Sequence, residues 1–82
     1  MHQVLVSVYD LKSNEYAPPF LQRSTAEAIR TFTSEVNNPK DGNLLFQNPE
    51  DFQLFHVGNW FPLSGTIEPV SLFIVYAGSV KQ

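Results

Sequence analysis

The sequence of 82 residues contains no cysteine and only four, scattered glycines. The absence of cysteine excludes a disulfide scaffold, a zinc site with thiolate ligands and a cysteine nucleophile. No glycine-rich loop that could hold a phosphate group is present. No apolar run approaches the ~20 residues that a membrane span needs, and the first residues lack the basic start and cleavage site of a secretory signal. We therefore expect a protein that stays in the cytoplasm of the cell that makes it.

Basic residues are also few, with five Lys and Arg against eight Asp and Glu and a net charge of −3. Such a balance is unfavourable for a protein that binds nucleic acid mainly by neutralising phosphates. The distribution is uneven, however, because four of the five basic residues fall within residues 12–40: Lys12, Arg23, Arg30 and Lys40. The same segment holds three glutamates, so a basic face is an alternative that the sequence leaves open.

The remaining composition is that of a small globular protein. Hydrophobic residues make up 43% of the chain, and seven Phe, three Tyr and one Trp must supply much of the buried area. At this length we expect one domain, residues 1–82, with a small core.

The first half predicts a hairpin followed by a helix. Residues 3–9 are rich in β-branched side chains and apolar on both faces, which is typical of a central strand. Residues 10–14 favour a turn, and residues 15–20 a returning strand that Pro18 and Pro19 confine to an edge or end. Ser24 and Glu27 form a capping-box pattern before a helix from about residue 25 to residue 37.

The second half predicts two more strands. Residues 38–50 are rich in Pro, Asn and Gly and read as a loop, with one helical turn after Asn48-Pro49. Residues 52–60 alternate as a third strand, a turn contains Ser64-Gly65, and residues 70–77 form a final apolar strand. The predicted fold is α+β: a small antiparallel sheet of about four strands, in the order strand, strand, helix, strand, strand, packed on one helix.

One helix cannot cover both faces of such a sheet. Because small proteins rarely expose a large apolar face, we expect the second face to be covered by the long loop, a second copy or another partner. We favour a symmetric homodimer, which is the commonest assembly.

Catalytic and metal-binding patterns are weak. His2 and His56 have no spacing that predicts a metal site. Glu50 and Asp51 follow Asn48-Pro49, where acidic side chains stabilise the start of a helical turn. No serine has the context of a nucleophile. We therefore expect no enzyme, no cofactor, no metal and no small-molecule substrate.

The aromatic residues suggest a different activity. Single-stranded nucleic acid can stack its bases on exposed rings beside a few cations, and Tyr9, Tyr16, Phe20 and Trp60 lie near strand ends or loops. The predicted nucleic-acid-binding residues are Lys12, Tyr16, Phe20, Arg23 and Arg30. The alternative is that these rings belong to the core or to a dimer interface.

Five segments in register resemble a known family. They are Val8-Tyr9-Asp10 with Lys12, the segment 16–20 (Tyr-Ala-Pro-Pro-Phe), Ala28-Ile29-Arg30 with Phe32, Val36-Asn37, and residues 48–58 (Asn-Pro-Glu-Asp-Phe, then Leu-Phe and Val-Gly). Together they resemble the small nonstructural protein of gokushovirus-type microviruses, phages of the Microviridae.

The resemblance implies a role but no catalytic residues. It implies a bacteriophage protein of the host cytoplasm that is not part of the capsid and that assists the switch to single-stranded DNA synthesis, with DNA or the viral replication complex as its partner. The alternative is an adapter that contacts the viral initiator, the procapsid or a host replication factor without binding DNA.

Overall fold

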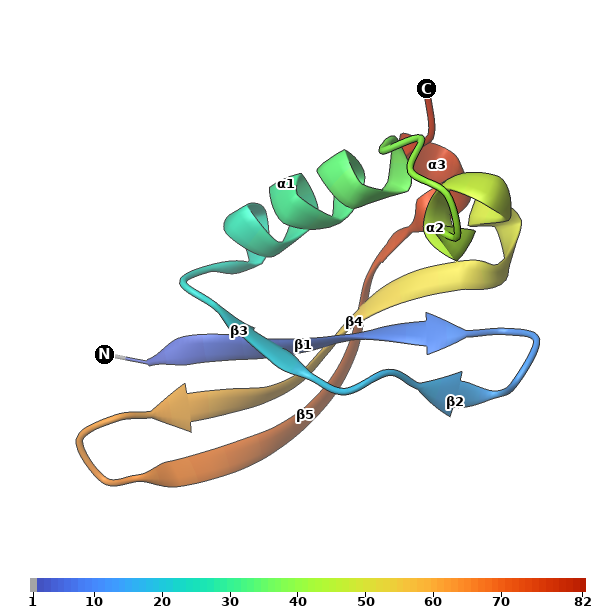
Figure 1. Cartoon of the computed structure of the whole chain (residues 1–82). Coiled ribbons are helices and arrows are strands. Elements are labelled where there is room, and N and C mark those ends of the chain that lie inside the picture. The colour runs from blue at the N-terminus through green and yellow to red at the C-terminus, as the bar shows by residue number, and fades with distance from the viewer. Residues whose placement is uncertain (1) are drawn as a thin grey trace.

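The computed structural model describes residues 2–82, in which all strands form one sheet and all helices lie on one side of it (Figure 1). Its elements are β1 (Gln3–Asp10), β2 (Glu15–Tyr16), β3 (Phe20–Gln22), α1 (Thr25–Val36), α2 (Leu44–Gln47), a 3-10 turn η1 (Pro49–Asp51), β4 (Phe52–Phe61), β5 (Thr66–Tyr76) and α3 (Ala77–Val80). The antiparallel sheet has the order β2-β1-β4-β5, and β3 also pairs with β1. The predicted α+β class is confirmed.

Strand β1 is central, as its two apolar faces predict. It pairs with β2 and β3 along one edge and with β4 along the other. The turn after it is also as predicted: the Asp10 carboxylate accepts a hydrogen bond from the amide of Lys12 at 2.8 Å, and Asn14 adopts a positive φ of 60°. Short polar side chains favour both features.

The returning strand is interrupted where the prolines lie. Pairing stops after Tyr16 and resumes at Phe20. Both parts, β2 and β3, lie at the edge of the sheet, which is one of the two predicted alternatives, whereas the continuation to Gln22 was not predicted. Proline has no amide hydrogen to donate, which explains the gap. Ser7 and Ala17 bridge it, because the Ser7 hydroxyl donates to the Ala17 carbonyl at 2.6 Å.

Helix α1 supplies one side of the core. Ser24 caps it by accepting a hydrogen bond from the amide of Glu27 at 3.1 Å, as the capping-box pattern predicts. Three residues of its apolar stripe are buried: Ala28, Phe32 and Val36. They pack against buried side chains of β1 and β4, which are Val4, Val6, Phe52 and Leu54. The helix therefore lies over the centre of the sheet.

The Ser24 cap provides a first prediction. Ser24→Ala removes the acceptor for one unpaired amide of the first helical turn, so we expect a loss of about 1 kcal/mol in the free energy of unfolding. Urea denaturation followed by circular dichroism measures it. Ser34→Ala, on the same helix but outside its N-terminal turn, is the control and should change stability by less than half as much.

The long segment after α1 packs beside the helices. Asn43 is almost fully buried, and its side-chain amide donates to the carbonyls of Glu35 and Asn38 at 2.9 and 2.8 Å. Asn43 also caps α2, a short helix that the sequence did not predict, whereas the turn at Pro49 is as predicted. The loop therefore lies on the helix side and does not cover the second face of the sheet.

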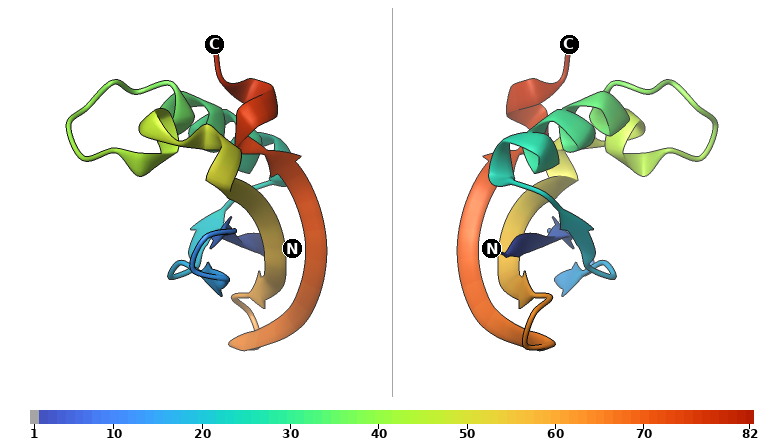
Figure 2. Two further views of the ribbon diagram at one scale, coloured as in Figure 1. Left: turned by 90° about the vertical axis from the view of Figure 1, so that its right-hand side faces the viewer. Right: turned by 90° about the vertical axis from the view of Figure 1, so that its left-hand side faces the viewer.

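Strands β4 and β5 form a long, curved ribbon (Figure 2). Strand β5 begins at Thr66, four residues before the predicted start, because Pro69 lies on an edge strand, where its missing donor costs no sheet hydrogen bond. The connecting turn contains Gly65 with a φ of 70°, and Leu63 at this tip is 96% exposed. The chain ends in α3, which was not predicted and which contacts α1 and η1.

All three helices lie on the same side of the sheet, and the other side is uncovered in both views (Figures 1 and 2). We call this uncovered side the open face. No helix within residues 2–82 has the length and apolar character to cross a bilayer.

Candidate functional site

The strand register shows which side chains lie on the open face. Directly opposed residues of an antiparallel pair share a face, and neighbours along a strand alternate. Because Val6 and Leu54 are buried in the core with α1, the residues next to each of them along its own strand point the other way. The register then places on the open face Gln3, Leu5, Ser7 and Tyr9 of β1, Tyr16 of β2, Leu21 of β3, Gln53, Phe55, Gly58 and Trp60 of β4, and Ile67, Pro69, Phe73 and Tyr76 of β5.

Four rings cross this face from one edge of the sheet to the other. We call Tyr16, Tyr9, Phe55 and Phe73 the aromatic row. The ring centroids of Tyr9 and Tyr16 are 4.6 Å apart, those of Tyr16 and Phe55 are 5.5 Å apart, and those of Phe55 and Phe73 are 5.8 Å apart. Such distances are typical of tilted and edge-to-face aromatic contacts.

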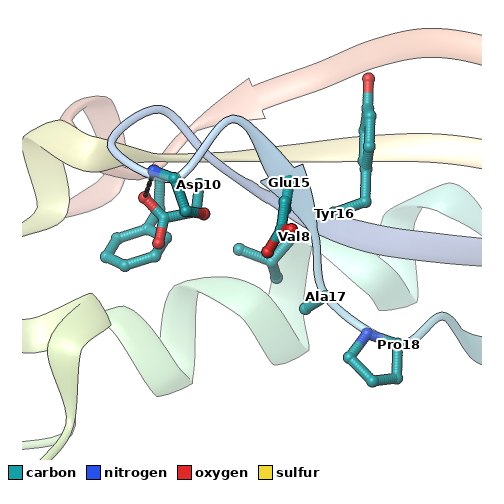
Figure 3. A pocket seen from close by; sticks show the side chains of 8 residues that line it. Val8, Asp10, Glu15, Tyr16, Ala17 and Pro18 are labelled. Carbon is teal, nitrogen blue, oxygen red and sulfur yellow. Dashed lines mark hydrogen bonds between the residues drawn. The ribbon is translucent and has the colours of Figure 1, made fainter.

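The row is accessible at both ends. Tyr16 is 50% exposed and Phe73 is 54% exposed. Figure 3 shows Tyr16 pointing away from the helix, whereas Val8 and Glu15 point toward it. Tyr9 and Phe55 between them are half-buried, so the two end rings offer the most surface to a flat partner.

Acidic residues of the sheet lie on the opposite side. Asp10 pairs with Glu15 and with the buried Phe52. Glu68 pairs with Asn59, whose other neighbour is the buried Val4. Within residues 2–82, the register places no charged residue on the open face. The net negative charge of the protein is therefore not concentrated beside the aromatic row.

The five predicted nucleic-acid-binding residues lie in three places. Tyr16 belongs to the aromatic row, and Lys12 lies in the exposed turn next to it. Phe20 opposes Val6, faces the helix and packs against the core. Arg23 and Arg30 lie on the helix layer, at 3.9 and 3.3 Å from the carboxylate of Glu27.

Lys12 and Arg23 are far apart along β1. Arg23 follows Gln22, which pairs with Val4 near the start of β1. Lys12 lies in the turn after Asp10, at the end of β1. Six residues of extended chain separate these positions, which is about 20 Å. The three predicted cations therefore do not converge on one surface, and Lys12 is the one beside the aromatic row.

A recess adjoins the row where two strand irregularities flank β1. On one side Ala17-Pro18-Pro19 interrupts pairing; on the other, the register of β4 shifts at Val57. Between them lies Ser7, whose small side chain is 1% exposed. The recess has a volume of about 470 Å³ and is lined by Ser7, Tyr16, Ala17, Pro18, Pro19 and Val57.

Other polar groups have structural roles. On the helix side, the amide of Asn59 links His56 at 2.9 Å to Glu68 at 2.8 Å and so connects β4 to β5. A smaller hollow of about 280 Å³ near Asp10 and Glu15 opens on that same side (Figure 3). Residues 2–82 contain no cluster of three or more side chains suited to a metal ion.

Sequence reasoning missed Phe55 as a partner of Tyr16 and Phe73 as a partner of Phe55, and it missed Ser7 and Val57 as part of a recess. Alternation along residues 52–60 separates Phe55 from its immediate neighbours. Whether Phe55 lies on the same side of the sheet as Tyr9 depends on how β4 pairs with β1. The one available signal was the small Ser7 between the larger Leu5 and Tyr9.

Comparison with known proteins places the chain in a family. A family model described as "Phage ORF5 protein" matches residues 3–80. The chain belongs to the Phage ORF5 protein family. It is 32% identical over 77 residues to Protein ORF5 of Chlamydia phage 1, a member of the Microviridae, and the match covers 92% of this chain and 80% of that protein. No solved structure matches it.

Membership in the ORF5 family agrees with the predicted resemblance to a microvirus protein. The match spans every element from β1 to α3, so the open face and its aromatic row lie within the region that defines the ORF5 family.

Proposed function

We propose that this ORF5 protein is a non-enzymatic accessory of viral DNA synthesis that binds single-stranded DNA on the open face. It would act in the host cytoplasm and assist the switch to single-stranded genome production. The observation that carries the proposal is the aromatic row, which crosses the whole sheet on the side that the helices leave uncovered.

Base stacking explains how a protein with a net charge of −3 could bind DNA. Stacking on an aromatic ring contributes roughly 1 to 3 kcal/mol per base and tolerates any base, because every base has a flat face. The row offers exposed rings at Tyr16 and Phe73. Affinity would then come mainly from stacking and less from phosphate neutralisation.

The net charge is unfavourable, but the charged side chains of the strands do not lie on the open face. The acidic residues of the sheet point to the helix side, and Lys12 lies in the exposed turn beside Tyr16. A strand that follows the row can keep its phosphates near Lys12 while its bases face the rings. Few phosphate contacts imply a shallow dependence of affinity on salt.

Fluorescence anisotropy with labelled oligonucleotides tests the proposal. At low salt we expect binding of single-stranded DNA and weaker binding of duplex, whose bases cannot reach the rings. Lys12→Ala should weaken binding uniformly across sequences and lower the salt slope by about 1. Arg30→Ala removes the same charge from the helix layer and should have the smaller effect. No binding at tens of micromolar protein would refute DNA contact.

A second candidate is an adapter that contacts the viral initiator, the procapsid or a host replication factor. One observation favours it: residues 52–80 contain a single charged residue, Glu68, although β5 is largely exposed. Depletion of charge is typical of the centre of a protein interface. A second copy would fit such a surface as well, and this keeps the symmetric dimer as a proposal.

Two measurements separate these candidates. In a pull-down from nuclease-treated lysate of infected cells, a partner that remains bound is not bridged by DNA and supports the adapter. Light scattering at high protein concentration tests self-association, and a strict monomer would contradict the dimer. DNA binding by a strict monomer would leave the first proposal as the one supported.

A further inference from the structure

We propose that the recess beside the aromatic row is a subsite for one nucleobase of the bound strand. This inference rests on the proposed function and adds a position to it: one base would enter the recess while its neighbours stack on the row. The occupant is identified by chemistry as a flat, uncharged ring system of DNA, without selection among the four bases.

The first argument is that two independent irregularities create the recess. On one edge of β1, Tyr9 pairs with Tyr16 and Val6 pairs with Phe20. Two residues of β1 lie between these pairs, opposite the three residues 17–19. On the other edge, Leu5 and Val6 are consecutive, but their partners Gly58 and His56 are separated by Val57. Bulges of this kind occur preferentially beside functional sites.

The second argument concerns Ser7, the almost fully buried residue that lines the recess. Leu5 and Tyr9 lie on the same face as Ser7, so a serine stands where its neighbours are large. The Ser7 hydroxyl already donates a hydrogen bond to the Ala17 carbonyl. This polar group therefore needs no hydrogen bond from a ligand. A larger apolar residue at this position would fill the depression.

The third argument concerns chemistry and continuity. No charged residue lines the recess, and four of its six lining residues are apolar: Ala17, Pro18, Pro19 and Val57. The recess therefore suits an uncharged group better than a phosphate. Its volume lies within the range of about 300 to 1,000 Å³ found for small-molecule sites. Tyr16 lines the recess and also belongs to the aromatic row, so one strand can occupy both.

An abasic scan tests the subsite. A labelled oligonucleotide of about nine nucleotides is prepared with one abasic position, moved stepwise along its length, and its affinity is measured by anisotropy. For the unaltered protein we expect losses at several neighbouring positions, because bases on the aromatic row also stack, and one of these losses, about 10-fold, depends on the recess. Val57→Trp should weaken binding of the intact oligonucleotide and abolish the difference at that position.

Matched variants keep the test informative. Leu72→Trp introduces the same side chain on β5 at a residue that is 58% exposed and on the opposite face, and it should leave the scan unchanged. If Val57→Trp fails to fold by thermal melting, Ala17→Leu fills the recess with less bulk and should give the same loss of discrimination.

Four results would overturn the inference. A scan with equal losses at every position, or an unchanged scan in a folded Val57→Trp, would refute the subsite while leaving DNA binding intact. A Val57→Trp variant that changes the oligomeric state in light scattering but not DNA affinity would assign the recess to a second copy. Absence of DNA binding by the unaltered protein would refute the proposed function itself.

Discussion

Phe32→Ala is expected to lower the free energy of unfolding by about 3 to 5 kcal/mol, the range for deleting a buried phenylalanine ring. Phe32 is 2% exposed and lies in the core formed by α1 with β1 and β4. Domains of this size have a total stability of about 5 to 15 kcal/mol, so this one change removes a large fraction of it. Thermal unfolding monitored by circular dichroism should show a midpoint lowered by about 15 °C or more.

Phe73→Ala is the matched control because it deletes the same ring from the open face. Phe73 is 54% exposed, and its ring contact is the one with Phe55. An edge-to-face contact contributes about 0.5 to 1.5 kcal/mol beyond burial, so we expect a loss well below that of Phe32→Ala. Equal losses for the two variants would show that the open face is buried in solution, for example by a second copy.

Local sequence signals predicted the elements that local chemistry determines. Ser24 and Glu27 marked the start of α1, Asp10 and Asn14 marked the first turn, and the apolar character of β1 on both faces marked a central strand. Each depends on residues within a few positions of one another, so composition and spacing were sufficient.

Strand boundaries and short helices that depend on distant partners were not predicted correctly. Strand β3 continues after the prolines because β1 offers it a second pairing segment at Val4 to Val6. Strand β5 begins before Pro69 because it has a neighbour on one edge alone. Short helices such as α3 form against the ends of other elements, and four residues carry too little periodicity to be recognised.

The same limit applied to the candidate site. Tyr16 and Lys12 were chosen for their positions near a turn, and they lie together beside the aromatic row. Phe20 was chosen for the same reason but faces the core, because residues 17–19 lie opposite only two residues of β1, and this one extra residue reverses the face. Sheet register, which brings Phe55 beside Tyr16, is a property of pairing and not of either strand alone.

Removing both ends of the aromatic row should have the largest effect on binding. Each stacked base contributes roughly 1 to 3 kcal/mol, so the double variant Tyr16→Ala with Phe73→Ala is expected to reduce affinity for single-stranded DNA about 100-fold. Both side chains are about half exposed, so the variant should remain folded, which thermal melting verifies. Anisotropy titrations with oligonucleotides at low salt measure the loss.

Leu72→Ala is the control for this double variant, because Leu72 is next to Phe73 in β5, is 58% exposed and opposes His56 on the other face. If stacking on the open face drives binding, Leu72→Ala binds DNA as the unaltered protein does. Equal weakening by Leu72→Ala would place DNA elsewhere on the ribbon. A folded double variant with unchanged affinity would exclude the row as the DNA contact, and the adapter would then explain why the rings are left uncovered.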